Sequence, residues 1–204
     1  MLFRSQEPAR ILEVWLFKNE KTYRRGAKQF FGDDPDTPYG YYSTAHDAMV
    51  MNIGPGAGTL VHELVHPYME ANFPAVPAWF NEGLASLYER PTEVRGHIRG
   101  LPNWRLPALK EEIRAGHGRS LVSLMSTSTD EFYEARDQAY ARARYLCYYL
   151  QEKGLLVDFY RRFKAGRADD PTGILALRAV LGRDDLRAFE DEWNQFVLHL
   201  DISR

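Results

Sequence analysis

The sequence contains a single cysteine, Cys147, among its 204 residues. An intramolecular disulfide bond and a cysteine-rich metal cluster are therefore both excluded. Cys147 lies in an apolar run, residues 145–150, whose pattern is typical of a helix. We therefore expect it to be a small buried hydrophobic residue rather than a nucleophile.

Long apolar runs are also missing. No segment approaches the ~20 apolar residues that a membrane-spanning helix needs. The first residues, "MLFRSQEPARILEVW", lack the apolar core of a secretory signal peptide. The sequence as given predicts a cytoplasmic location, although an extracytoplasmic chain whose signal peptide had been removed would look the same.

The sequence has little net charge, −2, and this value does not favour nucleic acid as a partner. Residues 90–119 are locally basic, which we interpret as a solvated surface. The chain is 45% hydrophobic and 26% charged, as expected for a soluble globular protein. Its length is typical of one domain, residues 1–204. Its oligomeric state is left open.

The pattern of residues predicts strands first and helices afterwards. Strands are expected at 11–17, 39–43 and 48–53, with a helix from Asn19, its N-cap, to Gly32. Thr59 is the expected N-cap of the next helix. Beyond Pro77 the chain is expected to be almost entirely helical, at 78–89, 107–115, 121–126, 130–152, 155–164, 171–181 and 184–200. This order predicts an α+β fold with segregated layers, in which lobe 1–76 contains a small mixed sheet and lobe 77–204 is mostly helical.

The stretch "TLVHELVHPYME" places two histidines four residues apart, His62 and His66, with Glu63 beside the first. On a helix, both imidazoles share one face and can bind one cation. Glu63 lies about 100° round the helix, where it can reach a metal-bound water. Pro67 follows directly, and we expect it to kink or end the helix around His66.

A catalytic zinc ion needs a third protein ligand. Glu82, in "PAWFNEGLASLY", is the candidate, because it follows His66 by 16 residues on a separate predicted helix. Three prolines in the intervening segment allow the chain to turn so that the two helices face each other. The alternative is that the histidines make only ordinary hydrogen bonds on a helix face.

"HELVH" followed by "WFNEGLA" resembles the gluzincins, zinc metallopeptidases with two histidines and a downstream glutamate on the metal. The short spacing is closer to a group of small bacterial peptidase MA-like domains. "YGYYSTAHDAMVMNI" and "AYARARYLCYYLQEKG" are also similar to segments of these domains, so the resemblance covers about residues 40–200. It implies a zincin-like fold in which the sheet-containing lobe carries the metal-binding helix.

The resemblance also implies roles for single residues. His62, His66 and Glu82 would bind zinc, and Glu63 would be the general base that activates a water and then protonates the leaving amine. Tyr140, in "QAYARARY", would donate to the oxyanion, although packing in a helical core is the alternative for this residue. Weaker candidates for that donor are Tyr133, Tyr145, His97 and His117.

Other residues near the motif have open roles. The strand 48–53 is expected at a sheet edge, where it either binds substrate backbone or is an ordinary strand. Asn81 either steers Glu82, meets a substrate terminus or only fills the helix. If zinc binds, the histidines need outer partners, for which the candidates are Asp47, Glu89 and Ser86.

The leading hypothesis is a zinc metallopeptidase acting on a peptide or protein. The first alternative is a metal-binding, non-catalytic domain of the same fold that recognises peptide or protein. The second is a structural interaction module in which the motif is vestigial. The loop "NIGPGAG" has no carboxylate to hold a substrate ammonium group, which favours an endopeptidase, or an enzyme with an unusual substrate, over an aminopeptidase.

Overall fold

The structure is a computed structural model that describes residue 6, residues 13–43 and residues 45–202. Within these residues the protein is α+β, with a three-stranded sheet, a two-stranded sheet and a large helical region. The predicted fold class is confirmed. No helix in the described part of the chain is both long and apolar enough to span a bilayer.

The three-stranded sheet has the order β1-β3-β2. Strand β1 (Glu13–Phe17) pairs in parallel with β3 (Ala48–Asn52), and β2 (Gly40–Ser43) pairs with β3 in the antiparallel sense. The prediction that the 48–53 strand lies at the sheet edge is therefore wrong. All five residues of β3 are buried, as a central strand covered on both faces requires. Its two edges are occupied, so a substrate strand has no free edge of β3 to join.

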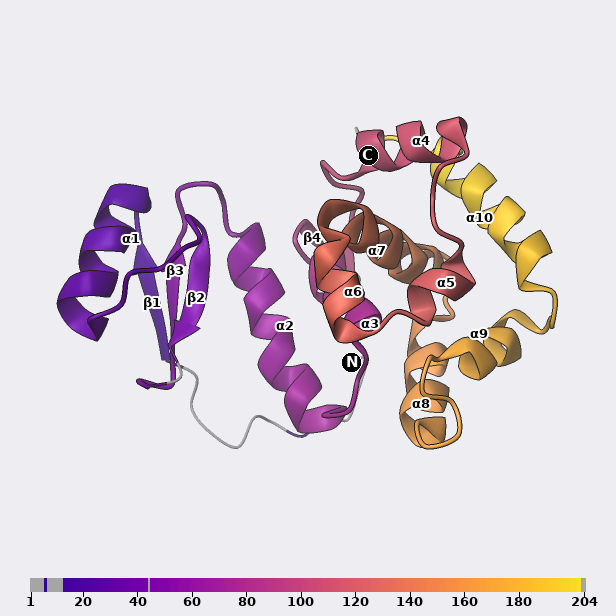
Figure 1. The fold of residues 1–204 in the computed structure, drawn as a ribbon, viewed down its shortest axis with the longest axis horizontal. Helices are drawn as coiled ribbons and strands as arrows, with labels where there is room; N and C mark the ends of the chain where they lie inside the picture. Colours follow the sequence, from indigo (N-terminus) through magenta and orange to yellow (C-terminus); the bar gives the residue numbers. More distant parts are fainter. Residues whose placement is uncertain (1–5, 7–12, 44, 203–204) are drawn as a thin grey trace.

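The sheet is covered on one side by α1 (Glu20–Gly26) and the short π-helix η1 (Ala27–Phe31), and on the other by α2 (Gly58–Asn72) (Figure 1). As predicted, Asn19 caps α1, and its side chain accepts a hydrogen bond from the backbone N–H of Thr22. Gly32 ends the helical segment with a φ of 73°, a value that favours glycine. Residues 11 and 12 of the first predicted strand lie outside the described residues.

Helix α2 differs from its prediction at both ends. It begins at Gly58 with Ala57 as N-cap, so the prediction of Thr59 as the cap is wrong. It also continues through Pro67 to Asn72, so it does not end around His66 as one form of the prediction had it. Proline removes one backbone donor, but the turn after it is held by other bonds. The Asn72 side chain donates to the Tyr68 carbonyl at 2.8 Å, and the N–H of Phe73 donates to the Met69 carbonyl at 2.6 Å.

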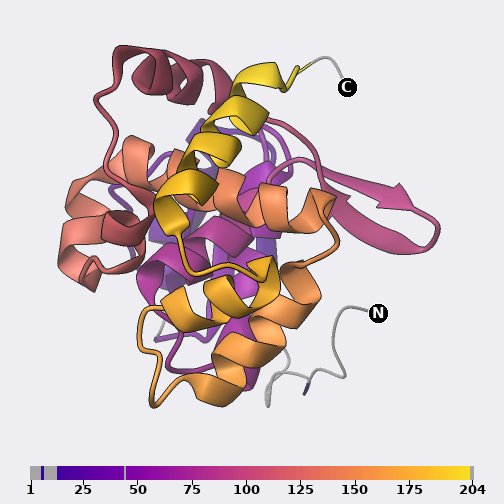
Figure 2. The same cartoon turned by 90° about the vertical axis from the view of Figure 1, so that its right-hand side faces the viewer.

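Helix α3 (Ala78–Leu87) is followed by a β-hairpin, β4 (Pro91–Val94) and β5 (His97–Gly100). The hairpin projects from the helical body (Figure 2). Our expectation of an almost wholly helical chain after Pro77 is wrong here. The two turn residues, Arg95 and Gly96, have φ values of 53° and 76°, as a tight two-residue hairpin requires. The exposed strands lack the alternation of apolar residues that would have revealed them.

The remaining elements form the helical lobe around α3. The predicted helix 130–152 is interrupted, because it divides into α6 and α7. Cys147 is buried in α7, as expected. The helices are α4 (Leu106–Ala115), α5 (Leu121–Met125), α6 (Thr129–Glu134), α7 (Arg136–Glu152), α8 (Leu156–Gly166), α9 (Ile174–Leu181) and α10 (Leu186–His199).

Helix α7 is the main packing partner of α3. The two helices approach closely at Gly83, where an added Cβ would lie 2.9 Å from the backbone of Ala143. Only glycine fits this crossing without displacing one of the helices. Because Gly83 follows Glu82 directly, the crossing also fixes where the Glu82 side chain starts.

Candidate metal centre

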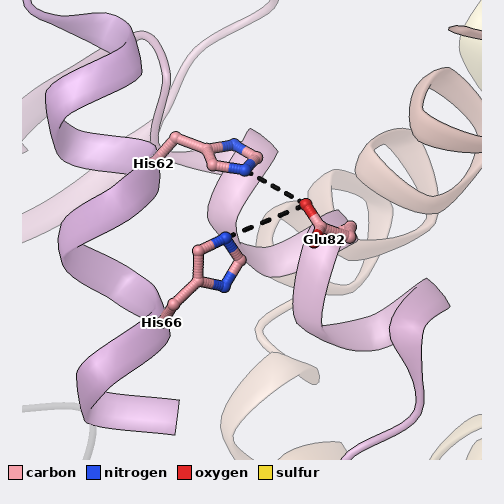
Figure 3. Close-up of side chains that lie close together, drawn as sticks. All are labelled: His62, His66 and Glu82. Carbon is pink, nitrogen blue, oxygen red and sulfur yellow. Dashed lines mark hydrogen bonds and ion pairs between the residues drawn. The ribbon is translucent and has the colours of Figure 1, made fainter. Parts of the chain in front are cut away.

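The two histidines of α2 point toward α3 (Figure 3). They are one helical turn apart, and their ring centroids are separated by 5.0 Å. His62 is buried, with 8% of its surface exposed, and His66 is half-buried. Since Pro67 leaves the preceding turn intact, the helix presents both rings on the same face, as the sequence predicts.

Glu82 of α3 reaches into the space between the two rings. Its Oε2 atom lies 3.1 Å from Nε2 of His62 and 3.9 Å from Nε2 of His66. One ligand atom from each residue lies within 4.8 Å of the other two. The structure thus brings together the three ligands predicted from sequence, from two separate helices.

The outer nitrogens of the histidines also have partners. Nδ1 of His62 lies 3.4 Å from Oε1 of Glu89, an ion-pair contact rather than a well-aligned hydrogen bond. Nδ1 of His66 lies 3.2 Å from Oδ1 of Asn81. Asn81 therefore contacts a histidine instead of steering Glu82. Carboxylate and amide oxygens in these positions fix the orientation of metal-binding imidazoles.

The other two candidates for outer partners have different surroundings. Asp47 lies in the sheet-containing lobe and accepts a hydrogen bond from the hydroxyl of Tyr42. Ser86 is fully buried on α3, but its hydroxyl has no hydrogen-bond partner within the described part of the chain.

Glu89 is itself held by a loop that the sequence did not single out, residues 101–105. Nδ2 of Asn103 donates to Oε2 of Glu89 at 2.9 Å. Arg105 contacts both carboxylate oxygens, with Nη2 at 3.2 Å from Oε1 and Nε at 3.4 Å from Oε2. No local sequence signal marks these two residues, because their role depends on a carboxylate 14 and 16 positions earlier.

Two tyrosines border Glu82. The Tyr133 hydroxyl donates to Oε1 of Glu82 at 2.8 Å, and the Tyr140 ring stacks on His62 with centroids 6.4 Å apart and planes 21° apart. Burial first, and then the charge of Glu82, raise the pKa of both phenols, so they stay protonated and able to donate. Tyr133, the weaker candidate from sequence, therefore donates a hydrogen bond directly to one of the proposed ligands.

The other rivals of Tyr140 lie elsewhere. The Tyr145 hydroxyl is buried and accepts a hydrogen bond from the backbone N–H of Asn103 at 3.0 Å, so it supports the loop instead. His97 is on the hairpin and His117 follows α4, and both are exposed. Both histidines are therefore surface residues.

Glu63 lies on α2 and is half-buried. Its negative charge contributes to the raised pKa of His62 and, after stronger effects, to that of Tyr133. Its carboxylate is therefore within electrostatic range of both groups.

The centre is rich in negative charge. Burial lowers the pKa of His62, but its contacts with Glu82 and Glu89 outweigh burial and raise the pKa to about 9. Burial would raise the pKa values of Glu82 and Glu89, whereas their histidine contacts hold both below the usual range. In the absence of a metal ion, a proton on His62 thus offsets the negative charge of Glu82 and Glu89. A bound cation would offset the same charge.

Comparison of this chain with protein-family models, curated proteins and solved structures found no match.

Proposed function

We propose that this protein is a zinc-dependent metallopeptidase of the gluzincin kind, with a zincin-like fold. The observation that supports this most strongly is the convergence of His62, His66 and Glu82, whose ligand atoms lie within 4.8 Å of one another. Two of these residues come from α2 and the third from α3, so helix packing brings them together without a flexible loop.

The donor set suits zinc. Two imidazoles and one carboxylate are a known ligand combination of catalytic zinc, and they leave a fourth position open. Each histidine also has an oxygen atom beside its outer nitrogen, from Glu89 for His62 and from Asn81 for His66. The buried carboxylates Glu82 and Glu89 favour a cation at this place.

The chemistry that we propose is hydrolysis of a peptide bond. A bound zinc ion would supply Lewis acidity, which lowers the pKa of water and polarises a carbonyl oxygen. Glu63 would accept the proton from the attacking water on its carboxylate and pass it to the leaving amine. Its partial exposure is compatible with both transfers, because the group can meet solvent and substrate.

Tyr140 remains our candidate for the hydroxyl that donates to the developing oxyanion, and Tyr133 is the nearest rival. Both phenols are protonated at neutral pH, because their pKa values are raised. A protonated hydroxyl fixed beside the ligands can stabilise negative charge on the substrate oxygen.

The experiment that tests the function combines metal analysis with proteolysis. We expect purified protein to contain one zinc ion per chain and to cleave members of a broad peptide library. Glu63→Gln should keep the zinc ion and lose cleavage. Full activity in this variant, or a metal-free protein after purification from zinc-containing medium, would contradict the proposal. Zinc without cleavage of any peptide would favour the alternative of a non-catalytic recognition domain.

A further inference from the structure

Arg105 lies at the centre of several contacts behind the proposed metal site. It is the N-cap residue of α4 and follows the loop that begins at Leu101. The loop is anchored, since the Pro102 carbonyl accepts a hydrogen bond from Arg90 at 2.6 Å and the Asn103 N–H donates to Tyr145 at 3.0 Å. The guanidinium is therefore presented from a fixed backbone.

On one side, Arg105 determines the orientation of Glu89. Two of its nitrogens contact the two oxygens of this buried carboxylate, at 3.2 and 3.4 Å. A guanidinium that contacts both oxygens sets the plane of the carboxylate as well as offsetting its charge. In that plane Oε1 of Glu89 points toward Nδ1 of His62.

On another side, Arg105 covers the ring of Tyr140. Its guanidinium carbon lies 5.3 Å from the centroid of that ring, within the range of a cation–π contact. The same Tyr140 ring stacks on His62. Arg105 thus supports His62 twice, at its outer nitrogen through Glu89 and at its ring face through Tyr140.

The remaining contacts of Arg105 restrict its movement. The guanidinium carbon lies 5.6 Å from the centroid of the Trp104 ring, and Nη1 lies 3.6 Å from the exposed carboxylate of Asp137. The Arg105 side chain is 16% exposed. A side chain held on this many sides has few alternative rotamers, so it can transmit a fixed geometry.

We propose that Arg105 is a positioning residue that couples His62 to Tyr140, so that one guanidinium sets both the orientation of a metal ligand and the place of the tyrosine. This inference rests on the proposed function. It adds a residue outside the ligand set that controls zinc affinity and turnover together.

Zinc affinity, measured by competition with a chromophoric chelator, tests the first half. Arg105→Gln should weaken zinc binding roughly 10- to 100-fold, as loss of an outer partner does. Arg105→Lys keeps the positive charge but cannot contact both oxygens, so it should fold like the wild type and still bind zinc several-fold more weakly. The control is Arg99→Gln, which removes the exposed contact between Arg99 of the hairpin and Glu152 of α7 and should leave zinc affinity unchanged.

Turnover at saturating zinc tests the second half. Arg105→Lys should lower kcat with little change in KM, because Tyr140 loses its support. In a Tyr140→Phe background the same change should have no further effect on kcat, since coupled residues are not additive.

Wild-type zinc affinity in Arg105→Lys, or equal losses of kcat in both backgrounds, would overturn the coupling while leaving the peptidase proposal intact. If Arg105→Gln does not fold, Arg105→Lys alone decides. A wild-type protein that binds no zinc would overturn both proposals.

Discussion

The carboxylate of Glu89 lies 3.4 Å from Nδ1 of His62, on the side of the ring away from Glu82. His62 is therefore held between two carboxylates, one at each ring nitrogen. The inner carboxylate is a proposed ligand and the outer one orients the ring, an arrangement that raises the basicity of an imidazole ligand.

Replacing the outer carboxylate tests this arrangement. Glu89→Gln should lower zinc affinity by roughly 10- to 100-fold, because the neutral amide no longer pairs with the imidazole and leaves Arg105 without its buried counter-ion. Affinity is measured by competition with a chelator. Glu152→Gln removes the exposed partner of Arg99 and should behave like the wild type. Equal affinities in all three proteins would contradict the role of Glu89.

The stability of the metal-free protein should depend on pH through His62. Its pKa is raised from 6.5 to about 9 in the folded protein. Its stabilising contribution is therefore fully present below pH 6.5 and is lost as the pH rises toward 9. Glu82 and Glu89 have lowered pKa values, so their contribution is present above about pH 4.5 and is lost as the pH falls.

Urea unfolding in the presence of a chelator measures this dependence. The free energy of unfolding should fall between pH 6.5 and pH 9, and His62→Gln should abolish most of that fall. Zinc affinity should rise over the same interval, because the metal competes with a proton for His62. A metal-free protein whose stability is the same at pH 6.5 and pH 9 would rule out a protonated His62.

The two tyrosines should respond differently to loss of the hydroxyl. Tyr133→Phe leaves Oε1 of Glu82 without its hydrogen bond and should destabilise the protein by about 1 kcal/mol. Tyr140→Phe keeps the stacked ring and should lower kcat about 100- to 1000-fold if its hydroxyl stabilises the oxyanion. Thermal unfolding and steady-state kinetics separate the effects. A large kcat loss in Tyr133→Phe alone would transfer the oxyanion role to that residue.

The crossing of α3 and α7 should control the metal centre from a distance. Gly83→Ala places a methyl group 2.9 Å from the Ala143 backbone and should destabilise the protein by about 1–3 kcal/mol. It should also weaken zinc binding, because α3 carries Glu82. Gly166→Ala is the control, since no atom lies within 4 Å of the added carbon. Chemical unfolding and zinc competition provide the two measurements, and unchanged values in Gly83→Ala would contradict the argument.

The sequence was most informative where a local pattern carries the chemistry. The four-residue spacing of His62 and His66 and the downstream Glu82 identified the residues that helix packing brings together. The α+β order and the Asn19 cap were also predicted correctly. Each depends on short-range geometry, which spacing and side-chain chemistry determine.

Other features depend on distant contacts, and the sequence did not reveal them. Pro67 predicted a break, but the surrounding hydrogen bonds keep α2 continuous. Strand β3 is central because β1 and β2 pair with its two edges. The sequence of β3 alone does not distinguish a central strand from an edge strand. The roles of Asn103 and Arg105 exist only because their loop folds back onto Glu89.

The placement of Glu82 and Glu89 seven positions apart has a consequence for insertions and deletions. Glu89 lies two residues past the end of α3 at Leu87, so one residue added within the helix would turn the segment that carries Glu89 by about 100° relative to Glu82. The connection at residues 73–77 lies outside both helices, and changes of length there are absorbed more easily. The centre should therefore tolerate a longer or shorter link between α2 and α3, but not a single shift of register within the 82–89 segment.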